Sequence, residues 1–468
     1  MAEPSTYDVL VIGAGMGGLL AACRLARSGK RVLLAEKLSF LGGRFSGFKV
    51  GEIEIPTGAF HTIPHGDKGP FSQALRRSGV ELEISKPRVF ASFHLNGEQI
   101  IAHNPFQVLK AFRTFRERVL AVKALLLSWF VKDFQGSYGD WLESLGMPAE
   151  GIAVYDRFCQ FSLSTTIREL PYSEGRKVTE MIFKYGLPGV PRGGAREVSR
   201  QLGLAARRAG VEIRQYTRVQ QLILKEGRVS GAVLFDRQRN IEYRVDSPLV
   251  ISDLGPGGTL RMFRDSGGLP NGSRAVFQAP PQPAIGLKIQ VLSPKSLVDQ
   301  DGIMFCLDTQ RIAGILQASN LDPDLAPPGK HLLISHQVIP DGADWRSEFQ
   351  LALEDWRQLF GSDFENCEIL GSSQFPASFP VNWASQGRDL REQPYADQGL
   401  WMVGDGMKPA GLMMAEGAAA SAESAVRGIL GDQRKAPWEH SLLAVRADRS
   451  LRAVGAVFQN TFNQKRSS

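Results

Sequence analysis

Residues 8–44 have the sequence DVLVIGAGMGGLLAACRLARSGKRVLLAEKLSFLGGR, in which two apolar runs enclose a cluster of glycines and the second run ends at a glutamate. This order predicts a βαβ unit. We expect a strand over residues 8–12, a helix through residues 19–26 that ends near Gly29, and a strand over residues 31–35. An uninterrupted apolar strand is typical of a parallel sheet that is covered on both faces.

The glycine cluster, residues 13–18, fits the GxGxxG pattern of a dinucleotide-binding loop. Gly13 permits the tight turn, Gly15 lets the backbone approach a pyrophosphate, and Gly18 lets helix and strand pack closely. The helix N-terminus offers N–H groups to the phosphates, and Glu36 is placed to accept hydrogen bonds from ribose hydroxyls. The alternative is a purely structural glycine turn, which the order of strand, loop, helix, strand and acid disfavours. The predicted dinucleotide-binding residues here are Gly13, Gly15, Met16, Gly17, Gly18, Glu36 and Lys37.

The residues after the second strand narrow the choice of dinucleotide. Residues 36–44, EKLSFLGGR, resemble the ExxxxxGGR signature of the flavin amine oxidase and phytoene desaturase superfamily. In that superfamily the paired glycines carry the chain past the cofactor and the arginine lies near its phosphates. The resemblance implies that the cofactor is FAD and that Gly42, Gly43 and Arg44 bind it.

A second motif, near the end of the chain, resembles the same superfamily. Residues 399–406, GLWMVGDG, are expected to form a short strand that closes on Gly-Asp, and in the superfamily this aspartate binds the ribityl chain or the pyrophosphate. A helix over residues 415–430 follows, rich in small residues. The resemblance implies that its N-terminus points at the N1–C2=O edge of the flavin, where the helix dipole stabilises the reduced state. It also implies cofactor contacts by Gly404, Asp405, Gly411, Leu412 and Met413.

The middle of the chain resembles the adenine-side element of the superfamily. A helix over residues 195–209 precedes a short strand, a hairpin with its turn at Glu226-Gly227, and a buried strand over residues 249–253. The resemblance makes Val219 the candidate for a backbone contact with the adenine. Asp253-Leu254 departs from the asparagine-alanine that the family often has at this place.

These three pieces are expected to assemble into one domain of an α/β protein. The resemblance implies a discontinuous, Rossmann-like FAD-binding domain of the GR2 type together with a second, α+β substrate domain. We expect the FAD-binding domain to comprise residues 1–85, 190–260 and 395–430, the substrate domain residues 86–189 and 261–394, and a basic amphipathic tail residues 431–468.

The composition is that of an ordinary globular protein, with 43% of the 468 residues hydrophobic and 22% charged. The four cysteines lie far apart, so we expect no metal site, no disulfide framework and a reducing compartment. No signal peptide and no run of about 18 apolar residues is visible, which favours a cytoplasmic protein, membrane-associated only at the inner face. The formal charge of +7 comes without a nucleic-acid-binding motif, so no nucleic-acid partner is expected. The oligomeric state stays open.

Two basic stretches favour peripheral contact with a membrane. In residues 105–134 apolar side chains recur at helical spacing and basic residues outnumber acidic ones, and residues 442–462 have a similar pattern. A basic amphipathic helix rich in Phe, Leu and Trp lies in a membrane interface. A core helix with a solvated basic face explains the first stretch equally well.

Two side chains are candidates for the chemistry. Lys288, on a predicted strand over residues 286–291, resembles the lysine that reaches flavin N5 through a water in flavin amine oxidases; the alternative is an exposed strand lysine. His61 follows the GGR segment and is a candidate for lining the active site, although His61 and His65 are equally well explained as loop histidines.

The resemblance predicts an FAD-dependent oxidoreductase of the phytoene desaturase and carotenoid isomerase-like branch. Its substrate would be hydrophobic and isoprenoid- or carotenoid-like, and the reaction either a desaturation or a redox-neutral isomerisation. One alternative is a flavin amine oxidase, which would carry an aromatic cage beside the flavin. Another is a non-catalytic flavoprotein partner or chaperone, in which the substrate cavity has closed.

Overall fold

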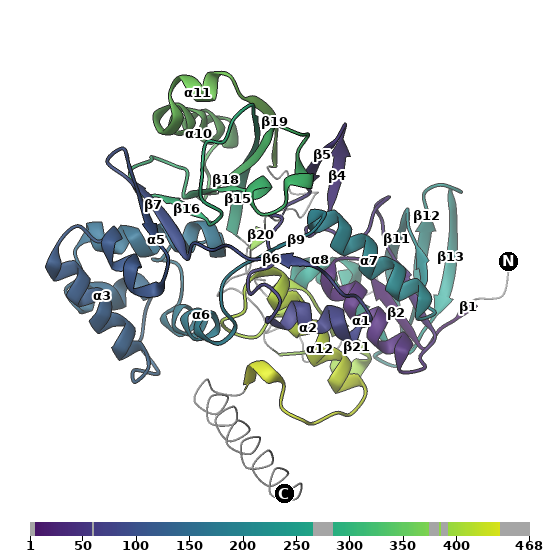
Figure 1. Ribbon diagram of the computed structural model, residues 1–468. Coiled ribbons are helices and arrows are strands. Elements are labelled where there is room, and N and C mark those ends of the chain that lie inside the picture. The colour runs from purple at the N-terminus through teal and green to yellow at the C-terminus, as the bar shows by residue number, and fades with distance from the viewer. Residues whose placement is uncertain (1–4, 59, 265–283, 374–382, 385–391, 440–468) are drawn as a thin grey trace, which may run out of the picture.

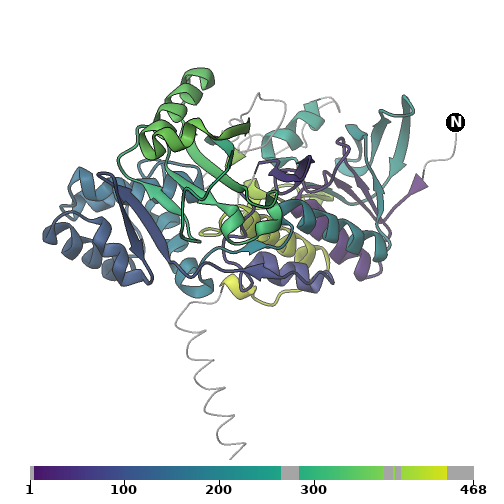
Figure 2. The same ribbon diagram turned by 45° about the horizontal axis from the view of Figure 1, so that its top comes forward.

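The computed structural model describes residues 5–58, 60–264, 284–373, 383–384 and 392–439 (Figure 1). The glycine-rich βαβ unit lies in one half of the molecule and the large antiparallel sheet with its helices in the other. Both views place helix α3 (Phe115–Ser128) and the three strands β11 (Thr217–Lys225), β12 (Arg228–Asp236) and β13 (Ile241–Asp246) at opposite ends of the molecule (Figures 1 and 2).

A five-stranded parallel sheet forms the centre of the first half. Its order is β10-β3-β2-β14-β21, and all of its neighbouring pairs run parallel. The strands come from the three separate parts of the chain that the sequence motifs identify, so the α/β fold with a discontinuous Rossmann-like domain is confirmed. The strands span Glu212–Arg214 (β10), Val32–Ala35 (β3), Val9–Ile12 (β2), Val250–Ser252 (β14) and Leu400–Met402 (β21).

Four helices, three of them rich in small residues, pack together beside this sheet. Helix α1 (Met16–Arg27) contacts both α7 (Gly194–Arg208) and α12 (Met414–Ile429), and α2 (Pro70–Arg77) lies against α12. Helix α12 buries five alanines among the apolar side chains of α1 and the sheet. Small side chains let helix axes approach closely, which holds the C-terminal part of the chain against the N-terminal glycine loop.

A second sheet completes this half, in the order β1-β13-β12-β11. The predicted hairpin is longer than the sequence indicates, but its turn is where we expect it, because Glu226 (φ 53°) and Gly227 (φ 77°) both adopt positive φ. The strands span Ser5–Thr6 (β1), Ile241–Asp246 (β13), Arg228–Asp236 (β12) and Thr217–Lys225 (β11).

The other half is built on a large, mostly antiparallel sheet in the order β19-β15-β18-β17-β16-β7-β8, with β20 beside β15. Helix α10 (Trp345–Phe360) covers one face, where Trp356 packs with apolar residues of β15 and β18. The strands span Glu368–Ser373 (β19), Ala284–Ser293 (β15), His331–Ile339 (β18), Gly314–Gln317 (β17), Met304–Cys306 (β16), Ala91–Leu95 (β7), Glu98–Ala102 (β8) and Trp383–Ala384 (β20).

A group of helices from residues 105–185 packs on the opposite face of this sheet. The helical segments are η1 (Pro105–Ala111), α3, α4 (Tyr138–Ser144), α5 (Ala149–Leu163) and α6 (Tyr172–Tyr185). The remaining elements are short: α8 (Gly255–Arg264), α11 (Ser362–Glu365), hairpin β4 (Gly47–Val50) and β5 (Ile53–Pro56), and the pair β6 (Ile84–Ser85) and β9 (Val190–Pro191).

The basic stretch over residues 105–134 is split into two helical segments. Segment η1 ends at Ala111, and a new helix begins after Thr114, whose side chain forms a capping box with Glu117. The core-helix explanation holds for one side of α3 only: Leu120 and Leu127 pack against the core, whereas Phe115, Val119 and Leu126 are exposed. The second basic stretch, residues 442–462, lies outside the described residues. Within the part of the chain that the structure describes, the helices are too short or too polar to cross a bilayer.

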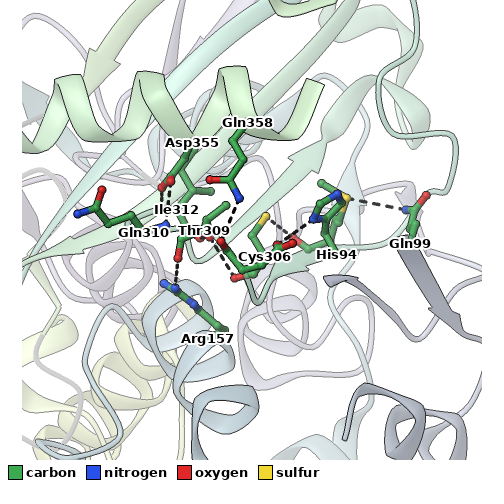
Figure 3. Close-up of polar contacts among 11 residues, drawn as sticks. His94, Gln99, Arg157, Cys306, Thr309, Gln310, Ile312, Asp355 and Gln358 are labelled. Atoms are coloured by element: carbon green, nitrogen blue, oxygen red, sulfur yellow. Dashed lines mark hydrogen bonds and ion pairs between the residues drawn. The ribbon is translucent and has the colours of Figure 1, made fainter. Parts of the chain in front are cut away.

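A polar cluster ties the loop between β16 and β17 to two helices (Figure 3). Asp355 on α10 accepts hydrogen bonds of 2.6–2.8 Å from the backbone N–H groups of residues 310–312. Arg157 on α5 donates to the carbonyl of Thr309, and His94 Nδ1 lies 2.9 Å from Asp308 Oδ1. The carboxylate and the guanidinium here satisfy backbone groups, so the cluster is structural.

Candidate functional site

A single large cavity joins the glycine loop to an aromatic chamber in the second half of the molecule. Its volume is about 1480 Å³. Small-molecule sites are usually about 300–1,000 Å³, so this cavity has room for a dinucleotide and a second molecule. Three separated parts of the chain line its polar end, through Gly15, Glu36, Val219 and Asp405.

The glycine loop leaves the N-terminus of α1 open to this cavity. Gly13, Gly15, Met16 and Gly17 line it, and Gly15 precedes the helix with no side-chain cap and no acidic residue in the first turn. Met16 and Gly17 at this helix start line the cavity, where their N–H groups suit an anion, whereas the N–H of Gly18 donates to Asp253 Oδ2. Gly18 is buried against the loop instead, where an added Cβ would lie 2.1 Å from the carbonyl oxygen of Gly13.

Asp253 packs into the glycine loop, a position that the sequence analysis did not predict for it. An added Cβ at Gly15 would lie 2.3 Å from its Oδ2, and one at Gly404 2.5 Å from its Oδ1. Its Oδ2 accepts a hydrogen bond of 3.0 Å from the N–H of Gly18. Burial raises the pKa of Asp253 to about 7, against the opposing effects of that N–H and of Arg44. The glycines are therefore required by this carboxyl group as well as by any phosphate.

Glu36 lies at the end of β3 with both carboxylate oxygens in use. Oε2 accepts a hydrogen bond of 2.7 Å from the N–H of Ala14, and Oε1 one of 2.8 Å from the N–H of Leu38. Burial raises the pKa of Glu36, and these backbone N–H groups oppose the rise. Each oxygen keeps a second lone pair for a ribose hydroxyl. Lys37 and Val219 also line this end of the cavity.

The two superfamily motifs meet at Asp405. Its Oδ2 lies 3.2 Å from Nη2 of Arg44 and its Oδ1 lies 3.3 Å from Nζ of the fully buried Lys408. Gly42 and Gly43 have φ of 98° and 55°, and the N–H of Gly42 donates to the carbonyl of Ala14 at 2.7 Å. The GGR segment thus lies against the glycine loop, and its arginine binds the aspartate of the C-terminal motif.

The start of α12 lines the cavity at Met413 and Met414. Gly411 and Leu412 do not, which corrects the sequence interpretation of these two residues. The N–H of Gly411 donates to Glu174 Oε1 at 2.8 Å, and its Cα packs against Lys177 on α6. Leu412 is fully buried in an apolar cluster beside α6. They position the helix start without facing the cavity.

Lys288 is buried on β15, so the exposed-lysine alternative is wrong. Ile289 and Val291 pack toward α10, and strand alternation places Lys288 on the opposite face, where it lines the cavity. Its Nζ donates to the carbonyl of Gly58 and lies 5.1 Å from the ring centre of Phe60. Burial lowers the pKa of Lys288 to about 7, and Arg44 adds to the effect.

His336 and Ser164 accompany Lys288, and sequence reasoning missed both. His336 is the cross-strand partner of Lys288, and its Nε2 lies 2.9 Å from Ser164 Oγ. Burial and Lys288 hold the pKa of His336 well below its usual range, so its ring is neutral. Ser164 lines the cavity with a left-handed backbone (φ 52°), which is uncommon for serine. Strand pairing between residues about fifty apart leaves no local sequence signal.

His61 is a structural residue, so its prediction as a catalytic residue is wrong. Its side chain is fully buried outside the cavity lining; Nδ1 accepts a hydrogen bond of 3.2 Å from the N–H of Ala195, and Nε2 lies 3.0 Å from the carbonyl oxygen of Glu54. Burial lowers its pKa to about 4. Among the described residues no group of three His, Cys, Asp or Glu side chains is placed to hold a metal ion.

The far end of the cavity is a chamber with an apolar, aromatic lining. Phe60 and Phe161 stack with ring centres 4.6 Å apart, and Phe305 contacts Phe161 edge-on at 5.8 Å. Asp301 is a charged residue in this part of the lining, and its Oδ2 is paired with Nε of Arg88 at 2.9 Å. The aromatic lining includes Phe60, Phe93, Phe112, Phe158, Phe161 and Phe305.

Comparison with known proteins decides the family. Residues 11–78 match the model of an NAD(P)-binding Rossmann-like domain. An uncharacterised protein of Methanocaldococcus jannaschii is 31% identical over 87% of this chain and 96% of its own length. The crystal structure of an oxidoreductase from Methanosarcina mazei superposes with a TM-score of 0.81 at 28% identity, over 89% of this chain and 99% of that one.

The chain belongs to the same family as the Methanocaldococcus protein, and it is an oxidoreductase with the fold of the flavin amine oxidases. Prolycopene isomerase of Arabidopsis thaliana is a weaker relative, 26% identical over 77% of this chain and 66% of its own length. Putrescine oxidase has the same fold, with a TM-score of 0.69 at 15% identity over 91% of this chain and 99% of that one. The protein is therefore an enzyme that uses FAD.

The residues of this flavoenzyme fit FAD. The cavity-lining start of α1 and the cation of Arg44 suit the diphosphate, Glu36 suits the ribose, and the start of α12 suits the flavin edge. Bound FAD supplies hydride transfer at flavin N5. Lys288 can hold or release a proton at Nζ near neutral pH, and the aromatic chamber excludes water from the reacting carbon.

Proposed function

We propose that this flavoenzyme acts on an elongated, hydrophobic, isoprenoid- or carotenoid-like substrate, which it desaturates or isomerises. The observation that carries the proposal is the continuity of the aromatic chamber with the FAD site, through Phe60 and Lys288. An apolar chain in this chamber would lie against aromatic side chains and place one C–H bond beside the flavin. The similarity to a prolycopene isomerase supports the same substrate class.

The amine oxidase alternative has less support. An amine substrate enters as a cation and needs a carboxylate or an aromatic cage. In the described lining of the chamber, the carboxylate of Asp301 already binds Arg88. Trp401 of the C-terminal strand β21 packs beside Gly428 on α12. The 15% identity to putrescine oxidase supports a shared fold and no shared substrate.

The non-catalytic alternative has a feature against it. A flavoprotein that had lost its substrate would be expected to have a closed or filled chamber. The cavity of about 1480 Å³ is instead open from the glycine loop to the aromatic residues. An open chamber of this kind supports a binding role for a second molecule.

Anaerobic mixing with candidate substrates tests the proposal. We expect an all-trans or cis polyene to bleach the oxidised-flavin absorbance of the holoenzyme, or to be isomerised without net bleaching. Mass spectrometry of the product separates the two reactions, since desaturation removes two hydrogens and isomerisation leaves the mass unchanged. Bleaching by primary amines, with no conversion of any isoprenoid, would overturn the proposal in favour of the amine oxidase.

A further inference from the structure

Helix α3 presents one stripe of large apolar side chains to water and its alanines to the protein, while Leu120 and Leu127 pack partly buried beside those alanines. Phe115 is 80% exposed and Leu126 56% exposed, whereas Ala121 and Ala124 are buried. Residues 115, 119, 122 and 126 fall on one stripe of a helix of 3.6 residues per turn, opposite the alanines. A helix that packed on a core would have the reverse arrangement. The orientation of α3 therefore leaves an amphipathic helix with its apolar face uncovered.

This face continues onto two neighbouring segments. Phe106 of η1 is 82% exposed, Phe130 after α3 is 79% exposed, and Phe183 of α6 contacts Trp129 with ring centres 5.8 Å apart. Other exposed large apolar residues of the described chain, such as Phe48 and Leu204, lie on separate elements. We define the apolar patch as Phe106, Phe115, Val119, Leu126, Phe130 and Phe183.

The apolar patch surrounds an opening of the chamber. Phe106, Leu126 and Phe183 are exposed, and the same side chains line the cavity, as does Val122 of the same helix stripe. A side chain that is both exposed and cavity-lining marks a place where the cavity reaches the surface. Phe112 and Phe158 also line the cavity, so apolar side chains continue from the patch into the chamber.

Basic side chains border the apolar patch. Lys110, Arg113 and Lys132 are exposed near the two ends of α3. By helical periodicity Arg116 and Lys123 flank one side of the apolar stripe and Arg118 flanks the other. Of the acidic residues in 105–134, Asp133 is exposed and Glu117 is buried in the capping box. Long basic side chains around an apolar face suit a surface that is apolar inside and anionic at its headgroups.

We propose that the apolar patch and its basic border dock the enzyme onto an anionic lipid bilayer, with the mouth of the chamber against the membrane. Helix α3 lies in the plane of the interface, and its apolar stripe enters the acyl region. A protein partner or a second copy on the same patch would close the mouth of the chamber, whereas a bilayer leaves the apolar path continuous. An anionic bilayer also complements the charge of the border.

Co-sedimentation of the purified holoenzyme with vesicles tests the docking surface. Vesicles of phosphatidylglycerol and phosphatidylcholine are compared with vesicles of phosphatidylcholine alone. We expect binding to the anionic vesicles that weakens with added salt, and that F115D/F130D weakens by more than about tenfold. Neither side chain lines the cavity, so the FAD content of this variant should match that of the wild type.

Two further variants make the test specific. Phe48→Asp changes an exposed phenylalanine on the β4–β5 hairpin, outside the patch, and should bind vesicles like the wild type. R113Q/R116Q/K123Q keeps the apolar face and should lose most of the preference for anionic lipid. Both variants should keep the wild-type melting temperature and gel-filtration volume.

Three results would overturn the docking surface: no binding of the wild type to either vesicle, equal binding of F115D/F130D and Phe48→Asp, or conversion of a wild-type oligomer to a monomer by F115D/F130D without vesicle binding. The last result would assign the patch to a second copy of the chain. Vesicle binding is measured without any substrate. Failure of the isoprenoid assay with intact, patch-dependent binding would therefore refute the substrate proposal and leave the docking surface standing.

Discussion

The two ends of the cavity differ in how their residues are specified. At the FAD end, short runs of the chain supply whole pieces of the site, because residues 13–18 form a loop and the neighbouring GGR segment lies directly against it. At the chamber end, each side chain comes from a different helix or strand. A cofactor shared by many enzymes is bound by backbone geometry, whereas an apolar substrate is bound by the shape that scattered side chains enclose.

The largest effect is expected from Glu36→Arg at the FAD end. The substitution removes both acceptors of the Ala14 and Leu38 N–H groups and places a cation in a buried site. The purified variant should lose most of its bound FAD, measured as flavin absorbance released on denaturation per mole of protein. Glu36→Gln, which keeps one acceptor, should retain more.

Full FAD occupancy in a folded Glu36→Arg variant would contradict the ribose role of this residue. It would also remove the contrast between the two ends of the cavity, since the FAD end would then tolerate substitution of its lining residues as well as the chamber does. A circular dichroism spectrum like that of the wild type is needed to exclude simple unfolding.

Substitution of two loop glycines sharpens the comparison within the FAD end. An added Cβ at Gly15 meets the Asp253 side chain at 2.3 Å, whereas one at Gly17 meets the backbone nitrogen of Gly404 at 2.8 Å. Each alanine variant should lose about 1–3 kcal/mol of stability, because overpacking displaces its neighbours. In an Asp253→Ala background, adding Gly15→Ala should cost little further stability. Adding Gly17→Ala in the same background should still cost most of what it costs in the wild type.

Denaturant unfolding of the two cycles measures the difference. Equal rescue of both glycine variants would mean that Asp253, rather than the backbone of Gly404, also sets the space at Gly17, where an added Cβ would lie 2.9 Å from Asp253 Oδ1. No rescue of either would mean that the phosphate-binding backbone alone requires the glycines.

The extent to which sequence could predict this molecule follows the same division. The βαβ unit and the motifs at residues 36–44 and 399–406 predict the parallel sheet, because the glycines there carry local backbone requirements. The pairing of Lys288 with His336 depends on which strands become neighbours, and local sequence does not encode it. The prediction of His61 as a catalytic residue is wrong for a related reason, since its burial depends on contacts with Ala195 and Glu54, which are distant or non-adjacent in the sequence.

The basic stretch over residues 105–134 shows a second limit of prediction from sequence. Its apolar periodicity is visible in the sequence, but periodicity gives a face and not the direction in which that face points. The small residues Ala121 and Ala124 were the available signal, since they form a second, smaller face that can pack closely on the protein.

A smaller effect is expected at the chamber end from Lys288→Met. The variant should keep its FAD, because Lys288 lies on β15 of the antiparallel sheet, whereas the glycine loop follows β2 of the parallel sheet. The rate of flavin reduction should fall by about 10²-fold, as for loss of a proton-transfer group. With a pKa of about 7, wild-type Lys288 becomes neutral as the pH rises through 7, so the wild-type rate should rise over that interval and the variant rate should not.

Stopped-flow reduction across a pH series measures this effect. Lys288→Arg is the matched control, because it keeps a cation that does not lose its proton in this range. A wild-type pH profile that survives in Lys288→Met would assign the titration to another group. The proton-transfer role would then not belong to the chamber end.

The most local effect concerns the pH dependence of stability at Asp253, because it depends on one buried carboxyl group. Its folded-state pKa is raised to about 7 by burial, whereas that of an unfolded aspartate is about 3.9. Between these values the native state binds a proton that the unfolded state lacks, so stability falls as the pH rises from about 4 to about 7, by at most about 1.4 kcal/mol per pH unit.

Asp253→Asn keeps the shape and removes the titration, so its apoprotein should lose this part of the slope. The groups that face Asp253, Arg44 and Glu36, remain in the variant, which makes the difference between the two unfolding series specific to residue 253. Identical slopes would show that Asp253 is ionised in the folded protein, and the loop would then hold a carboxylate beside the phosphates, with Arg44 as its counter-charge.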